Sequence, residues 1–210
     1  MPNWDANSIS MIEIIRSSTC IDDRYDHLSH VLSQVSITGL YLEFGVFDGG
    51  SVNYIADAIY PRIIFGFDSF VGLPEEWKRR RDNALTLPAG TFSVASLPEV
   101  RSNVRLIKGW FEDTLPAFIM NRCEDVAFVN IDSDIYSSAR TVLRNLNNRI
   151  VQGTILYFDE ITGWGDLVEQ YDTWEEGEYR ALLEWLSEYD REVEAISRNN
   201  RYGAALRVMR

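Results

Sequence analysis

The sequence has few of the residues on which disulfide scaffolds, zinc sites and nucleic-acid-binding proteins depend. Its 210 residues include two cysteines and two histidines, and the cysteines show no spacing typical of a disulfide framework or a metal site. Lys and Arg number 20 against 32 Asp and Glu, a formal net charge of −12, which would repel a phosphate backbone. We therefore expect no nucleic-acid partner, and we expect Cys20 and Cys123 to be reduced.

Long apolar runs are missing as well. No stretch reaches the roughly 20 apolar residues needed to cross a bilayer, and the N-terminus lacks a basic segment followed by an apolar one. These absences predict a cytoplasmic protein with no membrane partner. A hydrophobic content of 46%, without a low-complexity linker or a break in composition, predicts a single domain over residues 1–210.

Short apolar runs alternate with helical patterns along the middle of the chain. Runs rich in β-branched and aromatic residues predict buried strands, and apolar residues at every third or fourth position predict helices between them. The alternation predicts an α/β fold with a doubly wound, mostly parallel sheet covered on both faces. Strands are expected at 40–44, 63–67, 104–107, 126–131 and 154–158, and helices at 51–59, 114–120 and 137–146.

The two ends of the chain depart from this alternation. Helices are expected at 8–16 and 25–34, so residues 1–36 form a predicted helical cap beside the core at 38–162. Residues 163–210 predict a helix followed by two closely spaced strands, an antiparallel hairpin at the sheet edge. With this hairpin the predicted sheet has seven strands.

A glycine-rich turn follows the first predicted strand and leads into a helix. The run YLEFGVFDGGS at 41–51 lets a ligand approach bare backbone, although its Gly-x-x-x-Gly spacing differs from that of dinucleotide enzymes. The next strand ends in Asp68, where doubly wound folds hydrogen-bond a ribose. Alone, such an Asp would more simply form a turn; together, the two features predict a nucleoside site.

Two further strands end in carboxylates. Asp132 follows the fourth strand, Asp159 and Glu160 follow the fifth, and neighbouring strands lie about 4.8 Å apart. Oxygen ligands without His or Cys favour Mg²⁺ or another hard divalent cation, so we predict a metal site of Asp132, Asp159 and Glu160. The competing interpretation makes these residues strand-end caps, and for Asp134 it is the better one.

These motifs resemble those of class I S-adenosylmethionine (SAM)-dependent methyltransferases and, more narrowly, those of the TylF/MycF (macrocin O-methyltransferase-like) family. The resemblance rests on LEFGVFDGGS at 42–51, FDSFVGLPE at 67–75 and KGWFEDTLP at 108–116. It implies a SAM-dependent O-methyltransferase that acts on a hydroxyl of a small molecule, with a sugar as the first candidate. It also implies a divalent metal at the strand-end carboxylates, although Glu160 stands where relatives frequently have Asp.

The resemblance further implies roles for single residues. The glycine turn would lie along the methionine part of SAM, Asp68 would hold the ribose, and Trp110 or Phe111 would face the adenine ring. The cofactor-binding residues predicted in this way are Glu43, Gly45, Gly49, Ser51, Asp68, Ser69, Gly109, Trp110, Phe111 and Asp132.

The proton acceptor is less well specified. Catechol O-methyltransferases have a lysine where this chain has Ile135, so that role does not transfer. Asp132 and Asp134 are the predicted catalytic residues, with Tyr136 as an alternative. Three other functions stay open: a non-catalytic SAM-binding or scaffold domain, a metal-dependent phosphoesterase, and a NAD-dependent oxidoreductase. A homodimer is compatible with the sequence.

Some remaining features are expected to serve the surface or the acceptor. The basic run at 78–81 is interpreted as a solvated face, and His27 and His30 as surface residues of a helix. Trp164 and Tyr171, near the loop that contains Gly165 and Asp166, are candidates for a wall of the acceptor pocket.

Overall fold

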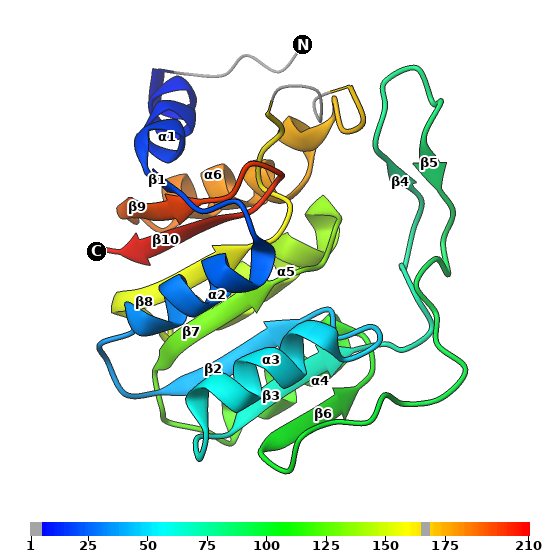
Figure 1. Ribbon diagram of the computed structural model, residues 1–210, viewed down its shortest axis with the longest axis vertical. Coiled ribbons are helices and arrows are strands. Elements are labelled where there is room, and N and C mark those ends of the chain that lie inside the picture. The colour runs from blue at the N-terminus through cyan, green and yellow to red at the C-terminus, as the bar shows by residue number, and fades with distance from the viewer. Residues whose placement is uncertain (1–5, 165–168) are drawn as a thin grey trace.

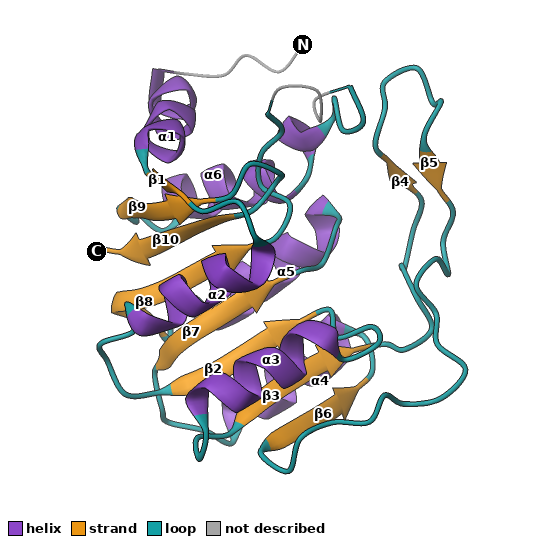
Figure 2. Cartoon of the chain, viewed as in Figure 1, coloured by secondary structure: helices purple, strands orange, loops and turns teal. Residues whose placement is uncertain are grey.

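A mixed sheet of eight strands forms the centre of the molecule, with helices on both of its faces (Figures 1 and 2). The computed structural model describes residues 6–164 and 169–210. In spatial order the strands are β1 (Thr19–Cys20), β9 (Val193–Arg198), β10 (Ala204–Val208), β8 (Ile150–Phe158), β7 (Val126–Ile131), β2 (Leu40–Phe44), β3 (Ile64–Asp68) and β6 (Val104–Lys108).

The central strands pair in parallel, and one C-terminal strand runs against them. Strands β6, β3, β2, β7 and β8 are parallel neighbours in that order. Strand β10 is antiparallel to both β8 and β9, which makes the C-terminal hairpin. The predicted doubly wound α/β fold with its antiparallel edge is therefore confirmed. The sheet has one strand more than the seven predicted, because the two exposed residues of β1 show no apolar pattern.

The helices divide between the two faces of the sheet (Figure 1). One face carries α2 (Arg24–Ser33) and α3 (Gly50–Ile59), and the other carries α4 (Phe111–Met120), α5 (Tyr136–Leu146) and α6 (Glu178–Glu188). Helix α1 (Ala6–Ser17) contacts β9. The short elements are β4 (Trp77–Lys78), β5 (Thr86–Leu87) and the 3₁₀ helix η2 (Trp174–Glu176). In the described part of the chain, no helix has the length and apolarity that a membrane span requires.

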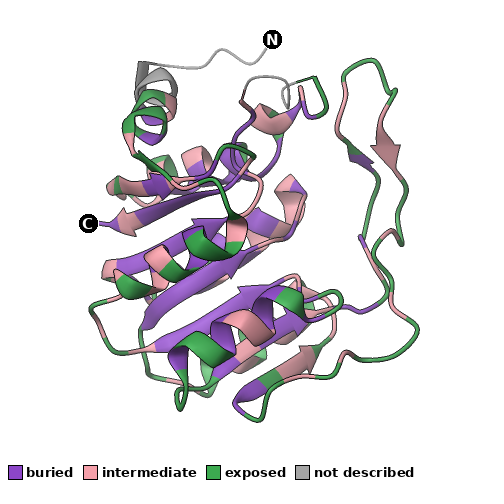
Figure 3. Ribbon diagram, in the orientation of Figure 1, coloured by how far each residue is buried: buried purple, intermediate pink, exposed green. Residues whose placement is uncertain are grey.

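The middle of the sheet is buried on both faces (Figure 3). Every residue of β2 and of β7 is buried. One apolar layer joins these strands to Leu143 of α5 and Trp185 of α6, and the second joins them to Leu28 of α2 and Ile55 of α3. Parallel strands covered on both faces consist of nearly continuous apolar residues, which is why the sequence showed apolar runs.

Strand β8 starts four residues earlier than the apolar run at 154–158 indicates. Its first residue, Ile150, already pairs with Val126, and the register then shifts before Phe128 pairs with Ile155. Gly153 lies inside the strand with a φ of 94°. A bulge of this kind interrupts the alternation of side chains, so the sequence pattern shows only the second half of the strand.

The prediction that His27 lies at the surface is wrong. Its side chain is fully buried on the face of α2 that packs against β9. Its Nε2 lies 2.9 Å from Ser197 Oγ, and its ring centroid lies 5.2 Å from that of Tyr157. Burial lowers the pKa of His27 to about 4, so the residue is a neutral core group at pH 7.

Candidate active site

The ends of four parallel strands form one row at the carboxyl edge of the sheet. The strand register places Phe67, Phe44, Ile131 and Phe158 side by side. Backbone hydrogen bonds of 2.9 Å from Asp132 N to Phe44 O and 3.0 Å from Asp159 N to Ile131 O extend the row by one residue. The residues that follow the row and share this edge are therefore Asp68, Gly45, Asp132 and Asp159.

A cleft of about 670 Å³ opens at this edge. The predicted site residues that line it are Gly45, Ser51, Asp68, Ser69, Trp110, Phe111, Asp132, Asp134 and Glu160. The predicted residues Glu43, Gly49, Gly109 and Asp159 lie outside its lining. Arg24, Tyr25 and Glu75 also line the cleft, although they were not among the predicted site residues.

The first glycine of the turn is required by its surroundings. Gly45 has a φ of 97°, a conformation that L side chains rarely adopt. A Cβ at this position would come within 1.8 Å of the carbonyl oxygen of Asp132. The absence of a side chain therefore lets β2 and β7 lie close together at the cleft.

Glu43 supports the glycine turn from beneath. Its side chain is fully buried, and Ser51 Oγ donates a 2.6 Å hydrogen bond to its Oε1. This bond connects β2, which precedes the glycine turn, to the first turn of α3, which follows it. Burial raises the pKa of Glu43 to about 8.

Asp68 shapes the turn as well as lining the cleft. Its Oδ2 accepts hydrogen bonds from the backbone N–H groups of Val46 at 2.8 Å and Phe47 at 2.9 Å. Its Oδ1 accepts from Phe70 N at 2.6 Å. The two bonds to Oδ2 use both of its lone pairs, whereas Oδ1 accepts one bond and has a second lone pair free. The turn-forming role therefore leaves Oδ1 able to accept a hydrogen bond from a ligand hydroxyl.

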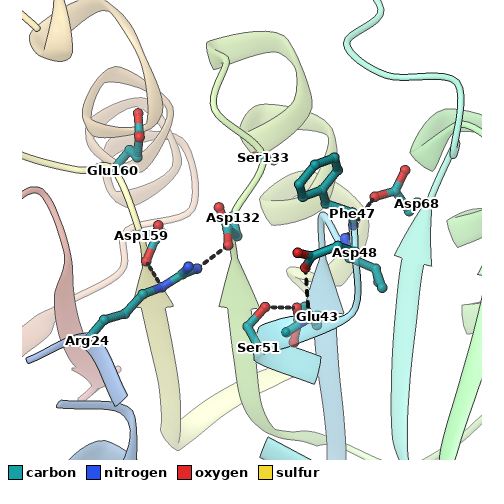
Figure 4. Close-up of polar contacts among 12 residues, drawn as sticks. Arg24, Glu43, Phe47, Asp48, Ser51, Asp68, Asp132, Ser133, Asp159 and Glu160 are labelled. Atoms are coloured by element: carbon teal, nitrogen blue, oxygen red, sulfur yellow. Dashed lines mark hydrogen bonds and ion pairs between the residues drawn. The ribbon is translucent and has the colours of Figure 1, made fainter. Parts of the chain in front are cut away.

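Arg24 is the main feature of the acidic side of the cleft. Its guanidinium bridges two neighbouring strand ends, with Nη2 2.5 Å from Asp132 Oδ2 and Nε 3.0 Å from Asp159 Oδ1 (Figure 4). Burial raises the pKa values of both carboxyls, and the guanidinium opposes that rise. The two aspartates do converge, and the positive charge that lies between them is the guanidinium of Arg24.

Glu160 does not join this pair. Its carboxylate points away from Asp132 and Asp159 (Figure 4), and Oε1 lies 3.8 Å from an Nη atom of Arg79. In the described part of the chain no three His, Cys, Asp or Glu side chains are arranged to hold a metal ion. As arranged, the three predicted ligands therefore do not fit a divalent cation.

Arg79 belongs to the basic run that was interpreted as a solvated face, and for this residue that interpretation is wrong. Its side chain is 17% exposed, and its guanidinium lies 4.6 Å from the ring centroid of Trp77, 4.9 Å from that of Tyr171 and 5.3 Å from that of Tyr202. Tyr171 is fully buried and outside the cleft lining, which removes it from the acceptor wall. These contacts fix the β4–β5 segment against the loop that precedes α6.

Trp164, the other aromatic residue proposed for the acceptor wall, also lies outside the cleft lining. Its ring stacks with Arg16 and Arg198, whose guanidinium carbons lie 5.0 Å and 5.3 Å from its centroid. Gly165 and Asp166 of the same loop fall outside the described residues.

Glu178 holds the loops that carry the strand-end carboxylates. It is the first residue of α6 and is fully buried. Its Oε1 accepts hydrogen bonds from Ser133 N at 3.1 Å and Ser133 Oγ at 3.2 Å, and its Oε2 accepts from Glu160 N at 3.3 Å. The sequence did not distinguish it from the other carboxylates between 159 and 194.

Asp134 has a different role from the helix cap that the sequence favoured. The residue that caps α5 is Ile135, without a side-chain hydrogen bond. Asp134 lines the cleft with a φ of 65°, and among the described residues no hydrogen bond or ion pair engages its carboxylate. Burial raises the pKa of Asp134 to about 7. Backbone strain of this kind concentrates at functional sites.

The chain matches the macrocin-O-methyltransferase (TylF) family over residues 15–186. It belongs to this family. The resemblance drawn from the sequence motifs is thereby confirmed.

Similar proteins agree with this membership. The 8-demethyl-8-(2,3-dimethoxy-alpha-L-rhamnosyl)-tetracenomycin-C 4'-O-methyltransferase of Streptomyces olivaceus is 30% identical over 172 residues, 70% of this chain and 64% of that relative. The demethyldecarbamoylnovobiocin O-methyltransferase of Streptomyces niveus is 28% identical over 179 residues, 75% of this chain and again 64% of the relative. The crystal structure of CalS11, a calicheamicin methyltransferase, shares the fold, with a TM-score of 0.65, 21% identity and coverage of 99% of this chain and 93% of CalS11.

Proposed function

We propose that this protein is a SAM-dependent O-methyltransferase that acts on a hydroxyl of a sugar-bearing small molecule. The observation that carries the proposal is the cleft, which has a nucleoside-type half at Gly45, Asp68 and Trp110 and an acidic half at Asp132 and Asp134. Family membership supports methyl transfer, and the two Streptomyces relatives, both named as O-methyltransferases, support oxygen as the methyl acceptor. The sugar is suggested by the rhamnosyl group in the name of the tetracenomycin relative.

The nucleoside half would bind SAM through features that are already in place. The glycine turn, which Asp68 and Glu43 hold in shape, would lie along the methionine part, and Asp68 would also face the ribose. Trp110 and Phe111 would flank the adenine ring. SAM, when bound, supplies an electrophilic methyl group, and the electron pair of the broken C–S bond stays on sulfur as the acceptor oxygen takes the carbon.

The acidic half would bind and deprotonate the acceptor hydroxyl. Asp134 is the proposed proton acceptor, because its carboxylate lines the cleft and is free of ion pairs among the described residues. A pKa of about 7 places this group where a general base works best near neutral pH. Asp132, held by Arg24, would position the acceptor, and the orientation of the two reactants would supply much of the acceleration.

The three predicted ligands, as arranged, do not fit the divalent cation that the sequence predicts. Arg24 lies between Asp132 and Asp159, and Glu160 faces Arg79. Side chains of this protein would therefore remove the proton and orient the hydroxyl.

A turnover assay tests the proposal. The protein is incubated with SAM and a panel of sugar-bearing small molecules, including rhamnosides, and formation of S-adenosylhomocysteine and of the methylated product is measured. We expect turnover with at least one sugar hydroxyl. Binding of S-adenosylhomocysteine without turnover of any acceptor would favour the non-catalytic SAM-binding domain instead, and binding of NAD would favour the oxidoreductase.

A further inference from the structure

We propose that the Arg24 guanidinium is the resident cation of the Asp132 and Asp159 pair, and that it excludes a divalent metal ion from this position. The sequence motifs imply a metal here, and the structure places a side chain of the same protein there instead. The inference concerns a positioning residue of the proposed active site, and its main test does not require turnover.

Geometry is the first support. Asp132 and Asp159 follow adjacent parallel strands, and each directs one oxygen at a different nitrogen of the same guanidinium. A guanidinium offers five N–H donors in a fixed plane, so it can bridge two carboxylates that are held at fixed positions. Mg²⁺ needs near-octahedral oxygen ligands at about 2.0–2.1 Å, and the guanidinium occupies the space between the two carboxylates where such an ion would lie.

The placement of Arg24 on its helix is the second support. Arg24 is the first residue of α2, and the Asp23 side chain caps this helix by accepting hydrogen bonds from Tyr25 N at 2.8 Å and Asp26 N at 3.0 Å. The helix packs against α3 and β9, with His27 fully buried one turn further on. The arginine therefore extends into the cleft from a fixed start, and its two ion pairs hold the guanidinium there although the side chain is 37% exposed.

The contacts of Glu160, the third predicted metal ligand, are the last support. Glu160 faces Arg79, which is held among three aromatic rings, and the backbone N–H of Glu160 donates to Glu178 Oε2 at 3.3 Å. A divalent ion would have to displace Arg24 and also draw Glu160 away from Arg79. Two arginines thus face the three predicted metal ligands.

Calorimetric titration of MgCl₂ and MnCl₂ into EDTA-treated protein tests the inference. We expect no saturable binding to the wild-type chain and at least about tenfold tighter binding to Arg24→Gln. The double variant Arg24→Gln with Asp132→Asn should lose this gain. Arg101→Gln is the matched control, because Arg101 pairs with Asp57 at 2.9 Å on the surface, outside the cleft lining. It should behave like the wild type.

Two results would overturn the inference: a wild-type chain that binds Mg²⁺ or Mn²⁺ as tightly as Arg24→Gln, or an Arg24→Gln chain that shows no gain. Urea unfolding of each variant checks that the protein remains folded. Arg24→Lys provides a second variant, since it keeps the positive charge and should still exclude the ion, although it loses the planar fork.

An activity measurement separates this inference from the proposed function on which it rests. Wild-type turnover of SAM should survive EDTA. If no acceptor is ever methylated but the metal titrations give the expected pattern, the function assigned above fails and the role of Arg24 stands. Turnover that EDTA abolishes and Mg²⁺ restores would overturn the role of Arg24 while supporting the methyltransferase.

Discussion

At the scale of single residues, the carboxylates of the cleft differ in their partners. Asp132 and Asp159 share Arg24, Glu160 faces Arg79, and Asp134 makes no hydrogen bond or ion pair among the described residues. Carboxylates that lie at one edge of the sheet therefore differ in their charged partners: Arg24, Arg79 or none among the described residues. Of these four carboxylates, Asp134 alone lines the cleft and has no hydrogen bond or ion pair among the described residues.

Asp134→Asn tests the assignment of the base. Asparagine tolerates the left-handed backbone at this position, so we expect the fold and the affinity for S-adenosylhomocysteine to be kept while turnover falls about 100-fold or more. Only the carboxylate form accepts a proton, so the wild-type rate should rise with pH through about 7 and then level off. A pH profile that stays flat across this range would contradict the assignment.

His27 gives a prediction about stability. Its pKa is lowered from 6.5 to about 4 by burial, so the unfolded chain binds the proton first and stability falls as pH drops below about 6.5. The full effect is about 3 kcal/mol, of which about 2 kcal/mol is lost by about pH 5. Urea unfolding should show the advantage of wild type over His27→Gln shrinking by about that amount between about pH 7.5 and pH 5. An advantage that is equal at both pH values would show that His27 is not a buried neutral group.

At the scale of elements, α6 controls the ends of β7 and β8. Its first residue, Glu178, accepts the backbone N–H groups of Ser133 and Glu160 in a buried position. Helix α6 therefore also fixes the position of the loops that carry Asp134 and Glu160.

Glu178→Ala should destabilise the protein by about 2 kcal/mol or more, because the buried N–H of Ser133 and the partly buried N–H of Glu160 lose their acceptor. Glu188→Ala, at the other end of the same helix, removes an exposed ion pair with Arg144 and should cost less than about 1 kcal/mol. The measurement is the free energy of unfolding in urea for both variants. Equal costs would show that Glu178 is no more than another surface carboxylate of an acidic helix.

Most elements could be predicted from the sequence because the buried parallel strands are continuous apolar runs. The elements that were missed lack such a pattern. Strand β1 has two exposed residues, and β4 and β5 have two residues each. Their position depends on partners far along the chain, such as Ser197 opposite Thr19, and no local pattern specifies those partners.

The residues of the candidate site also fall into two groups, those that a local sequence pattern predicted and those that it did not. Gly45, Asp68 and Asp132 were found because strand-end positions follow from the strand pattern. Arg24 was missed because its partner Asp132 lies 108 positions away, and a lone arginine at the start of a helix resembles any surface arginine. Glu178 was missed for the same reason.

In the molecule as a whole, the carboxyl edge of the parallel strands carries both the proposed nucleoside half and the acidic half of the cleft. Helix α6 holds the loops on the acidic side through Glu178. The arrangement places Asp68, the proposed ribose ligand, and Asp134, the proposed proton acceptor, in the same cleft. The proposed methyl transfer therefore depends above all on this cleft accepting a SAM-type nucleoside.

Calorimetric titration of S-adenosylhomocysteine into the intact chain, with NAD as the comparison ligand, tests that claim most directly. We predict saturable binding of one S-adenosylhomocysteine per chain and no binding of NAD. A titration with S-adenosylhomocysteine that shows no saturable binding would contradict the account.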